Sequence, residues 1–212
     1  MGTTPRRAGA IVASCLLIGA GAACAGTSDS RTPLPPTTTR VGNTDTYTYQ
    51  LVCPSPVGDL STSIDFTVTD SIENLVEGES VTYSITAPLA QVKSPVTPTF
   101  ESSTTTYAIP AGLKVTAARM DPESNSDFPT SSTKVDDTSV SFTINGSFPL
   151  DGTPRTVPTL VIDATVTATP GQDIVWTTPT SIVGSASVPI LGSQTSNCAF
   201  PTSGPIGTTR VT

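Results

Sequence analysis

The feature of this sequence that most limits its fold is a period-two alternation of apolar and polar residues, which begins at Tyr47 and recurs as far as Ile190. In Ile64-Asp65-Phe66-Thr67-Val68, every second residue is apolar. Because successive side chains of a β-strand point to opposite faces, such a segment predicts a strand with one buried face and one face in water. The alternation is also clear in Val81–Ala87, Val140–Ile144 and Leu160–Ala168.

Turn residues separate these segments. Gly78, Asn145-Gly146, Asp151-Gly152 and Pro170-Gly171 are of the types that accept the positive φ angles of tight turns. The chain contains 20 Pro and 16 Gly, and no long window shows a helical stripe of apolar residues. We therefore expect an all-β fold, an antiparallel, Ig-like β-sandwich of about eight to nine short strands. The strongest core candidates are Phe66, Tyr83, Ile85, Val115, Phe142, Ile162, Val166 and Trp176.

The first 24 residues have the composition of a signal peptide. Arg6 and Arg7 precede an uncharged segment whose most apolar part is Ile11–Ile18, and small residues follow. Three outcomes are compatible with this pattern. Cleavage before Cys24 would leave that cysteine acylated, as in a lipoprotein, whereas cleavage after Ala25 would release a free protein. The third outcome, an uncleaved anchor, is disfavoured because the apolar part is shorter than the ~20 residues that a membrane span needs.

The rest of the chain divides by composition. Residues 25–45 are rich in Thr and Pro and predict an extended linker. Residues 46–200 carry the alternating pattern of the β-sandwich domain, and residues 201–212 are assigned to a C-terminal tail. Within the domain, the long stretches Pro88–Pro98 and Pro122–Thr138 predict irregular loops.

The four cysteines lead to one predicted disulfide. Cys15 lies in the leader, and Cys24 is either acylated or removed with it. Both routes leave Cys53 and Cys198, an even pair in the oxidising compartment that a signal peptide implies. We therefore predict a bond between Cys53 and Cys198.

Composition limits the classes of function. The absence of His rules out Ser-His-Asp and Cys-His catalytic sets and makes most zinc sites improbable. The net charge is −7, and removal of the leader would also remove Arg6 and Arg7. An acidic chain without a basic patch does not neutralise phosphates, so we expect no nucleic-acid partner. We expect membrane contact only through an N-terminal lipid, and no cofactor.

Carboxylates are the remaining candidates for chemistry. Asp121, Glu123, Asn125 and Asp127 alternate as oxygen ligands do in calcium loops, but Ser126 stands where such loops have Gly. A solvated acidic loop is the alternative interpretation, and we prefer it. Asp65 and Asp163 lie in the middle of predicted strands between apolar neighbours, so we expect both side chains on outer faces.

Three segments carry a resemblance to known proteins: residues 46–70, which include Cys53, residues 109–116, and Asn197-Cys198-Ala199-Phe200-Pro201. Together they resemble a group of uncharacterised exported actinobacterial proteins over residues 45–200. The resemblance implies a sandwich domain after a signal peptide, with one cysteine near each end of the domain. It implies no activity.

Three functions remain after these exclusions. The first is a non-catalytic, secreted or lipid-anchored cell-envelope protein, a binding or structural module whose partner is another envelope protein, a glycan or a lipid. The second is a sandwich that opens to hold an apolar ligand such as a lipid, for which an apolar pocket would be the discriminating observation. The third is an enzyme with an unfamiliar set of catalytic groups.

Overall fold

Most of the strands form where the apolar alternation predicts them. The computed structural model describes residues 42–56, 58–87, 96–121, 127–128, 130–153 and 155–212. In the strand Leu60–Asp70, Ile64, Phe66 and Val68 are buried, whereas Asp65 between them is exposed. The two-residue repeat of the sequence therefore becomes the two faces of a sheet.

The described part of the chain contains twelve strands. They are β1 (Thr44–Cys53), β2 (Leu60–Asp70), β3 (Ser80–Thr86), β4 (Thr99–Ala108), β5 (Leu113–Met120), β6 (Thr130–Val135), β7 (Ser139–Pro149), β8 (Leu160–Val166), β9 (Asp173–Thr177), β10 (Ser181–Val188), β11 (Gly192–Cys198) and β12 (Pro205–Arg210).

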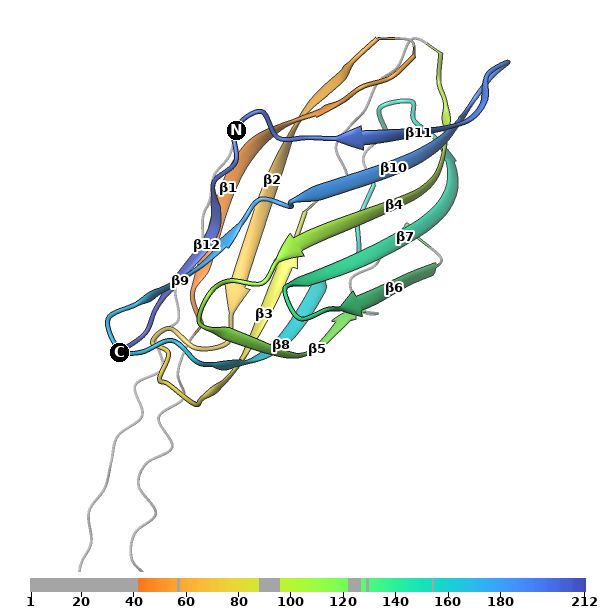
Figure 1. The fold of residues 1–212 in the computed structure, drawn as a ribbon. Helices are drawn as coiled ribbons and strands as arrows, with labels where there is room; N and C mark the ends of the chain where they lie inside the picture. Colours follow the sequence, from red (N-terminus) through yellow and green to blue (C-terminus); the bar gives the residue numbers. More distant parts are fainter. Residues whose placement is uncertain (1–41, 57, 88–95, 122–126, 129, 154) are drawn as a thin grey trace, which may run out of the picture. The chain divides into compact units, whose positions relative to one another are not determined.

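Two five-stranded antiparallel sheets pack as a sandwich, which confirms the predicted fold class (Figure 1). The first sheet has the order β1-β2-β3-β8-β5, and the second has the order β11-β10-β4-β7-β6. Strands β9 and β12 pair with each other in a separate two-stranded ribbon. This ribbon packs against the first sheet, where the backbone of Gly207 lies against the side chain of Val68.

The edges of the two sheets approach each other on both sides of the sandwich. On one side, Thr133 of β6 donates its hydroxyl to the carbonyl of Ala118 of β5 at 2.8 Å. On the other side, Val52 of β1 forms a β-bridge with Ala199, directly after β11. The disulfide and a pocket lie beside this second approach.

The core contains two separate groups of packed aromatic side chains. Tyr83 and Trp176 pack edge to face, with ring centroids 5.6 Å apart. Phe100, Phe128 and Phe148 form a second aromatic group, in which Phe100 stacks on Phe148 at 4.9 Å. Of the eight core candidates from the sequence, all are buried except Val115, which is partly buried. Val115 lies at a β-bulge in the edge strand β5, where the register against β8 shifts.

One predicted turn is wrong. Asn145-Gly146 lies inside β7 rather than between strands. Gly146 is nevertheless constrained, because a Cβ atom there would lie 2.8 Å from the ring of Phe148. The other three predicted turns do place a glycine at positive φ: Gly78, Gly152 and Gly171 have φ angles of 82°, 89° and 91°.

Three strands lie outside the predicted set of eight or nine. β6 lies in the predicted loop 122–138, and β11 carries no apolar alternation. β12 lies in residues that the sequence assigned to a C-terminal tail, yet Ile206 and Val211 are buried there. Residues 1–41, which hold the predicted signal peptide and most of the linker, lie outside the described residues. Within the described ranges, no helix is long and apolar enough to cross a bilayer.

Candidate functional site

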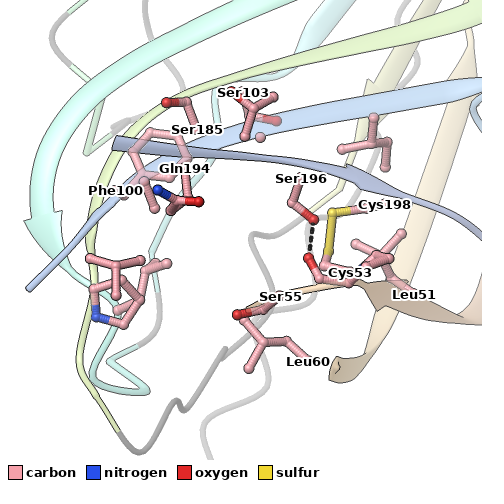
Figure 2. Close-up of a pocket in the computed structure, with 18 of the residues that line it drawn as sticks. Leu51, Cys53, Ser55, Leu60, Phe100, Ser103, Ser185, Gln194, Ser196 and Cys198 are labelled. Carbon is pink, nitrogen blue, oxygen red and sulfur yellow. Dashed lines mark hydrogen bonds between the residues drawn. A yellow bond between two sulfur atoms is a disulfide. The ribbon is translucent and has the colours of Figure 1, made fainter. Parts of the chain in front are cut away.

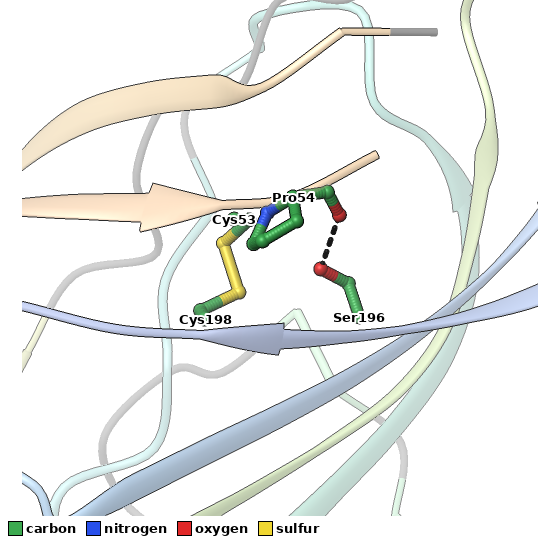
Figure 3. Close-up of a disulfide and its surroundings, with 4 residues drawn as sticks. All are labelled: Cys53, Pro54, Ser196 and Cys198. Carbon is green, nitrogen blue, oxygen red and sulfur yellow. Dashed lines mark hydrogen bonds between the residues drawn. A yellow bond between two sulfur atoms is a disulfide. The ribbon is translucent and has the colours of Figure 1, made fainter. Parts of the chain in front are cut away.

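The two sheets are joined covalently at one edge by the disulfide between Cys53 and Cys198, 145 residues apart in the sequence (Figure 3). Beside it, Val52 and Ala199 exchange two backbone hydrogen bonds, of 2.9 and 2.8 Å. The cysteines are the next opposed residues along these antiparallel segments, at a position without backbone hydrogen bonds. Opposed Cα atoms are closest at such positions, and those of the cysteines are 4.0 Å apart. The pairing of the chain thus places the two thiols within bonding reach.

Pairing between β1 and β11 stops directly after the disulfide, at Pro54. Continuing the register from Val52 and Ala199 places Pro54 opposite Asn197, where the next pair of backbone hydrogen bonds would form. Proline has no N–H to donate there. Instead, the side chain of Ser196 donates to the carbonyl of Pro54 at 2.6 Å (Figure 3). The chain after Pro54 therefore leaves β11, and a space opens between the sheets.

This space is an apolar pocket of about 150 Å³, partly open to solvent (Figure 2). The first sheet contributes Leu51, Leu60 and Ile64 to its wall. The second sheet contributes Phe100 together with the inward residues of β10, namely Ile182, Gly184, Ala186 and Val188. Gln194 and Ser196 of β11 and the disulfide itself complete the side shown in Figure 2.

The wall of the pocket is apolar and carries no ionisable side chain among its described residues. Among the described residues that line the pocket, none is Asp, Glu, Lys, Arg or Tyr, and both cysteines are bonded to each other. The wall therefore offers no side chain able to transfer a proton near neutral pH. A cavity of about 150 Å³ lined by aliphatic and aromatic side chains takes up one benzene-sized group.

A second, more polar pocket of about 480 Å³ lies on the other side of Cys198. Thr178 and Gly204 line it, and they are joined by a backbone hydrogen bond of 2.9 Å. The hydroxyl of Thr178 is buried and has no hydrogen-bond partner among the described residues. We assign no ligand to this pocket.

Glu101 occupies the outer face of the second sheet, above the strands that form the apolar pocket. It lies at a β-bulge of β4, where the register against β7 shifts between Phe100 and Ser102. Its carboxylate oxygen Oε2 accepts hydrogen bonds from Ser193 at 2.6 Å and from Ser185 at 2.7 Å. These two bonds hold the pKa of the exposed carboxyl group below its usual value. Glu101 therefore places a negative charge over β10 and β11.

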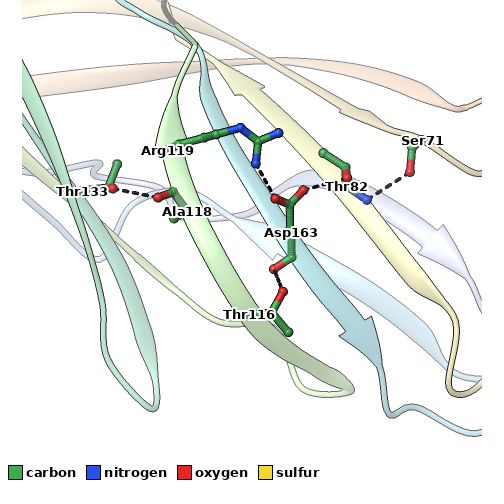
Figure 4. Close-up of polar contacts among 7 residues, drawn as sticks. All are labelled: Ser71, Thr82, Thr116, Ala118, Arg119, Thr133 and Asp163. Carbon is green, nitrogen blue, oxygen red and sulfur yellow. Dashed lines mark hydrogen bonds and ion pairs between the residues drawn. The ribbon is translucent and has the colours of Figure 1, made fainter.

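Asp65 and Asp163 both point outward from the first sheet, as predicted from the alternation. Asp163 forms an ion pair with Arg119 and accepts a 2.8 Å hydrogen bond from Thr82 (Figure 4). Asp65 accepts a hydrogen bond from Thr48 at 2.6 Å. Partners of this kind are structural cross-strand contacts, and the two carboxylates are not brought together as a catalytic pair.

The four calcium-ligand candidates fall partly outside the described residues, because Glu123 and Asn125 lie in the segment 122–126. Asp127 accepts a hydrogen bond from the backbone N–H of Thr156 at 2.7 Å. No group of three or more His, Cys, Asp or Glu side chains suited to a metal occurs in the part of the chain that the structure describes. Cys24, the lipidation candidate, also lies outside it.

The apolar pocket was not identified from the sequence. Its lining comes from five strands and three connections, and the alternation cannot show where two sheets part. One signal was available in Gly184, an isolated glycine in the middle of a strand pattern, which often marks a place where something approaches the backbone closely. A Cβ atom at Gly184 would have nothing within 4 Å.

Comparison with known proteins gave a structural likeness but no family. No protein-family model and no curated protein matches the sequence. One solved structure that matches comes from Corynebacterium diphtheriae and is described as a "putative membrane anchored protein". The match has 9% sequence identity and a TM-score of 0.43, and it covers 81% of this chain and 37% of that one. At this TM-score we infer neither family nor activity from it.

Proposed function

We propose that this chain is an exported, non-catalytic binding module of the cell envelope, whose site is the apolar pocket beside the disulfide. The observation that carries the proposal is the pocket itself, a space of about 150 Å³ between the sheets with an apolar wall and no ionisable side chain among its described lining residues. Of the functions that the sequence leaves open, a sandwich that opens to hold an apolar group fits this space best.

Two further observations support the proposal. Disulfides such as that between Cys53 and Cys198 are typical of proteins in oxidising compartments, which supports a location outside the cytosol. In addition, Gly184 stands on the inward face of β10, and the space above it is empty. A side chain at this position would complete the core, so its absence is what leaves the pocket available to a ligand.

The test is binding of benzene to the purified protein, followed by ligand-detected nuclear magnetic resonance. We expect saturable binding to the unmodified chain and at least a tenfold loss in Gly184→Leu, whose side chain fills the pocket. Ser187→Val is the matched control, since Ser187 belongs to the same strand but points to the opposite face. Binding that is absent, or that is equal in the unmodified chain and in Gly184→Leu, overturns the proposal.

A further inference from the structure

The strand β11 has one edge that no strand of the described chain covers. It is the last strand of the second sheet, and its inner edge pairs with β10 without a register shift. Ala199 directs its N–H and carbonyl away from β10, toward Val52. Since these groups alternate sides along a strand, the backbone groups of Ser193 and Thr195 also face outward. Pairing with β1 ends at Pro54, so β1 does not cover the outward backbone groups of Ser193 and Thr195.

This edge lacks the features that usually protect an edge strand from pairing with another chain. Edge strands are commonly interrupted by a bulge or carry Lys or Pro. The opposite edges show such features, because β5 has a bulge and Lys114, and β6 has Lys134. β11 contains only Gly, Ser, Gln, Thr, Asn and its terminal Cys. An edge without a bulge, a charge or a proline is able to accept an additional strand.

A strand added at this edge would present alternate side chains to the pocket. Gln194, Ser196 and Cys198 point to the inner face of the sheet and line the pocket. Because neighbouring strands lie about 4.8 Å apart and their side chains share faces, every second side chain of an added strand would lie beside them. The volume of about 150 Å³ admits one such side chain of the size of Leu or Phe, but not the length of a fatty acyl chain.

The outer face of the second sheet favours a positively charged side chain in the added strand. Residues of an added strand that flank the inserted side chain would point to the outer face, next to Ser193. There Glu101 is held over β11 by its hydrogen bond to Ser193. No Lys or Arg occurs in β10 or β11, and the whole chain carries a net charge of −7. A Lys or Arg in the added strand would therefore meet the negative charge of Glu101, which forms no ion pair with a described residue.

We propose that the partner at this site is an extended peptide segment of another protein, which pairs with the outer edge of β11 as an additional strand. It inserts one apolar side chain into the pocket and places a flanking Lys or Arg beside Glu101. This inference rests on the proposed function, because it uses the same pocket. In this mode of recognition, main-chain hydrogen bonds supply affinity and the pocket supplies selectivity.

The test is selection of heptapeptides from a random phage-displayed library on the purified protein. We expect enrichment of sequences with a central Leu or Phe flanked by Lys or Arg. The best of them, made synthetically, should bind at least tenfold more weakly to Thr195→Pro, which removes an outward N–H but no hydrogen bond to β10. Thr195→Val, which keeps that N–H, is the matched control and should bind normally. Glu101→Gln should lose the selection for basic residues.

The outcomes separate this inference from the proposed function. If Thr195→Pro still binds benzene but not the peptide, both are supported. If benzene binds and no peptide is enriched, or if the peptide binds Thr195→Pro normally, the peptide inference fails and the pocket function stands. Saturable binding of palmitate that displaces benzene and is unaffected by Thr195→Pro identifies a lipid site and likewise refutes the peptide inference. Failure of benzene to bind overturns the proposed function.

Discussion

Thr209 of the last strand donates its hydroxyl to the buried carboxylate of Asp70, which lies 139 residues earlier at the end of β2. The other oxygen of Asp70 accepts a 2.8 Å hydrogen bond from the backbone N–H of Asn43, just before β1. Only 4% of Asp70 is exposed. One side chain therefore connects the start of the described domain, the first sheet and the ribbon of β9 and β12.

Replacement of Asp70 by Ala should destabilise the fold strongly. It leaves the N–H of Asn43 and the hydroxyl of Thr209 without their acceptor, and an unsatisfied buried donor costs about 1–3 kcal/mol. We expect the free energy of unfolding to fall by about 2–4 kcal/mol in urea titrations. Asp65→Ala is the control, because Asp65 is exposed and bonds only a surface threonine, and it should change stability by less than about 1 kcal/mol. Equal effects of the two substitutions would contradict this account.

Removal of the disulfide should lower stability without changing the fold. The bond closes a loop of 145 residues, for which the chain-entropy model gives about 5 kcal/mol, and measured losses for native disulfides are about 2–5 kcal/mol. We expect Cys53→Ala combined with Cys198→Ala to lower the free energy of unfolding within that range. Trp176 is the single tryptophan and is buried, so its fluorescence reports the transition. A double variant as stable as the unmodified protein would show that the bond contributes nothing.

Tyr83 should make the protein sensitive to alkaline conditions. Burial raises the pKa of its phenol well above the usual range; nearby Thr209 opposes this shift, and the charge of Asp70 adds to it. Above about pH 10 the unfolded chain releases this proton while the folded chain keeps it, so stability falls as pH rises. Tyr83→Phe should reduce this loss in urea titrations between pH 8 and pH 11.

The same variant should cost little at neutral pH. The hydroxyl of Tyr83 is buried and forms no hydrogen bond of normal geometry with a described residue, although Thr209 lies near it. Removing it therefore deletes an unsatisfied group, and we expect stability at pH 7 to stay the same or to rise by up to about 1 kcal/mol. A large loss at pH 7 would show that the hydroxyl is bonded in solution.

Ile206→Ala should show that the C-terminal residues belong to the domain. Ile206 is fully buried in β12, and truncating a buried isoleucine costs about 2–5 kcal/mol. We expect a loss in this range in thermal or urea unfolding. Thr202→Ala, at an exposed site before β12, should leave stability nearly unchanged. A negligible effect of Ile206→Ala would show that residues 201–212 do not contribute to the stability of the domain.

Ile190→Asn should stabilise the protein. Ile190 lies at the tip of the hairpin between β10 and β11, is fully exposed, and has a φ angle of 74°. A β-branched residue is strained there, whereas Asn tolerates it, and relief of about 1 kcal/mol is expected. Leu191→Asn removes an exposed apolar side chain without relieving this strain, so its unfolding midpoint should stay closer to that of the unmodified chain.

Much of the fold could be predicted because burial follows the alternation of apolar residues. β2, β3, β7 and β8 each carry three or more alternating apolar side chains that face the core. β6 and β11 could not be found in this way, because they are edge strands whose side chains are nearly all polar. Their backbone pairing, rather than their side chains, makes them strands.

One part of the candidate site, the disulfide, could be predicted from the sequence, whereas the pocket could not. Counting cysteines was enough to pair Cys53 with Cys198, since the other two lie in the leader that the sequence predicts. The pocket depends on where β1 stops pairing with β11, and this is decided by the position of Pro54 opposite Asn197 across the sandwich. The sequence shows the proline, but the residue opposite it is known only once both sheets are in place.

The disulfide also determines how this domain would respond to a stretching force. Tension applied at residue 42 and at residue 212 would separate β1 from β2 and β12 from β9, but it would then reach Cys53 and Cys198. The covalent bond would carry the load from that point, and the 145-residue loop between them would not lengthen. Every residue of the pocket wall except Leu51 lies within this loop or is one of its two cysteines, so a partner held there would lose its contact with β1 but keep its contacts with a part of the chain that the bond protects.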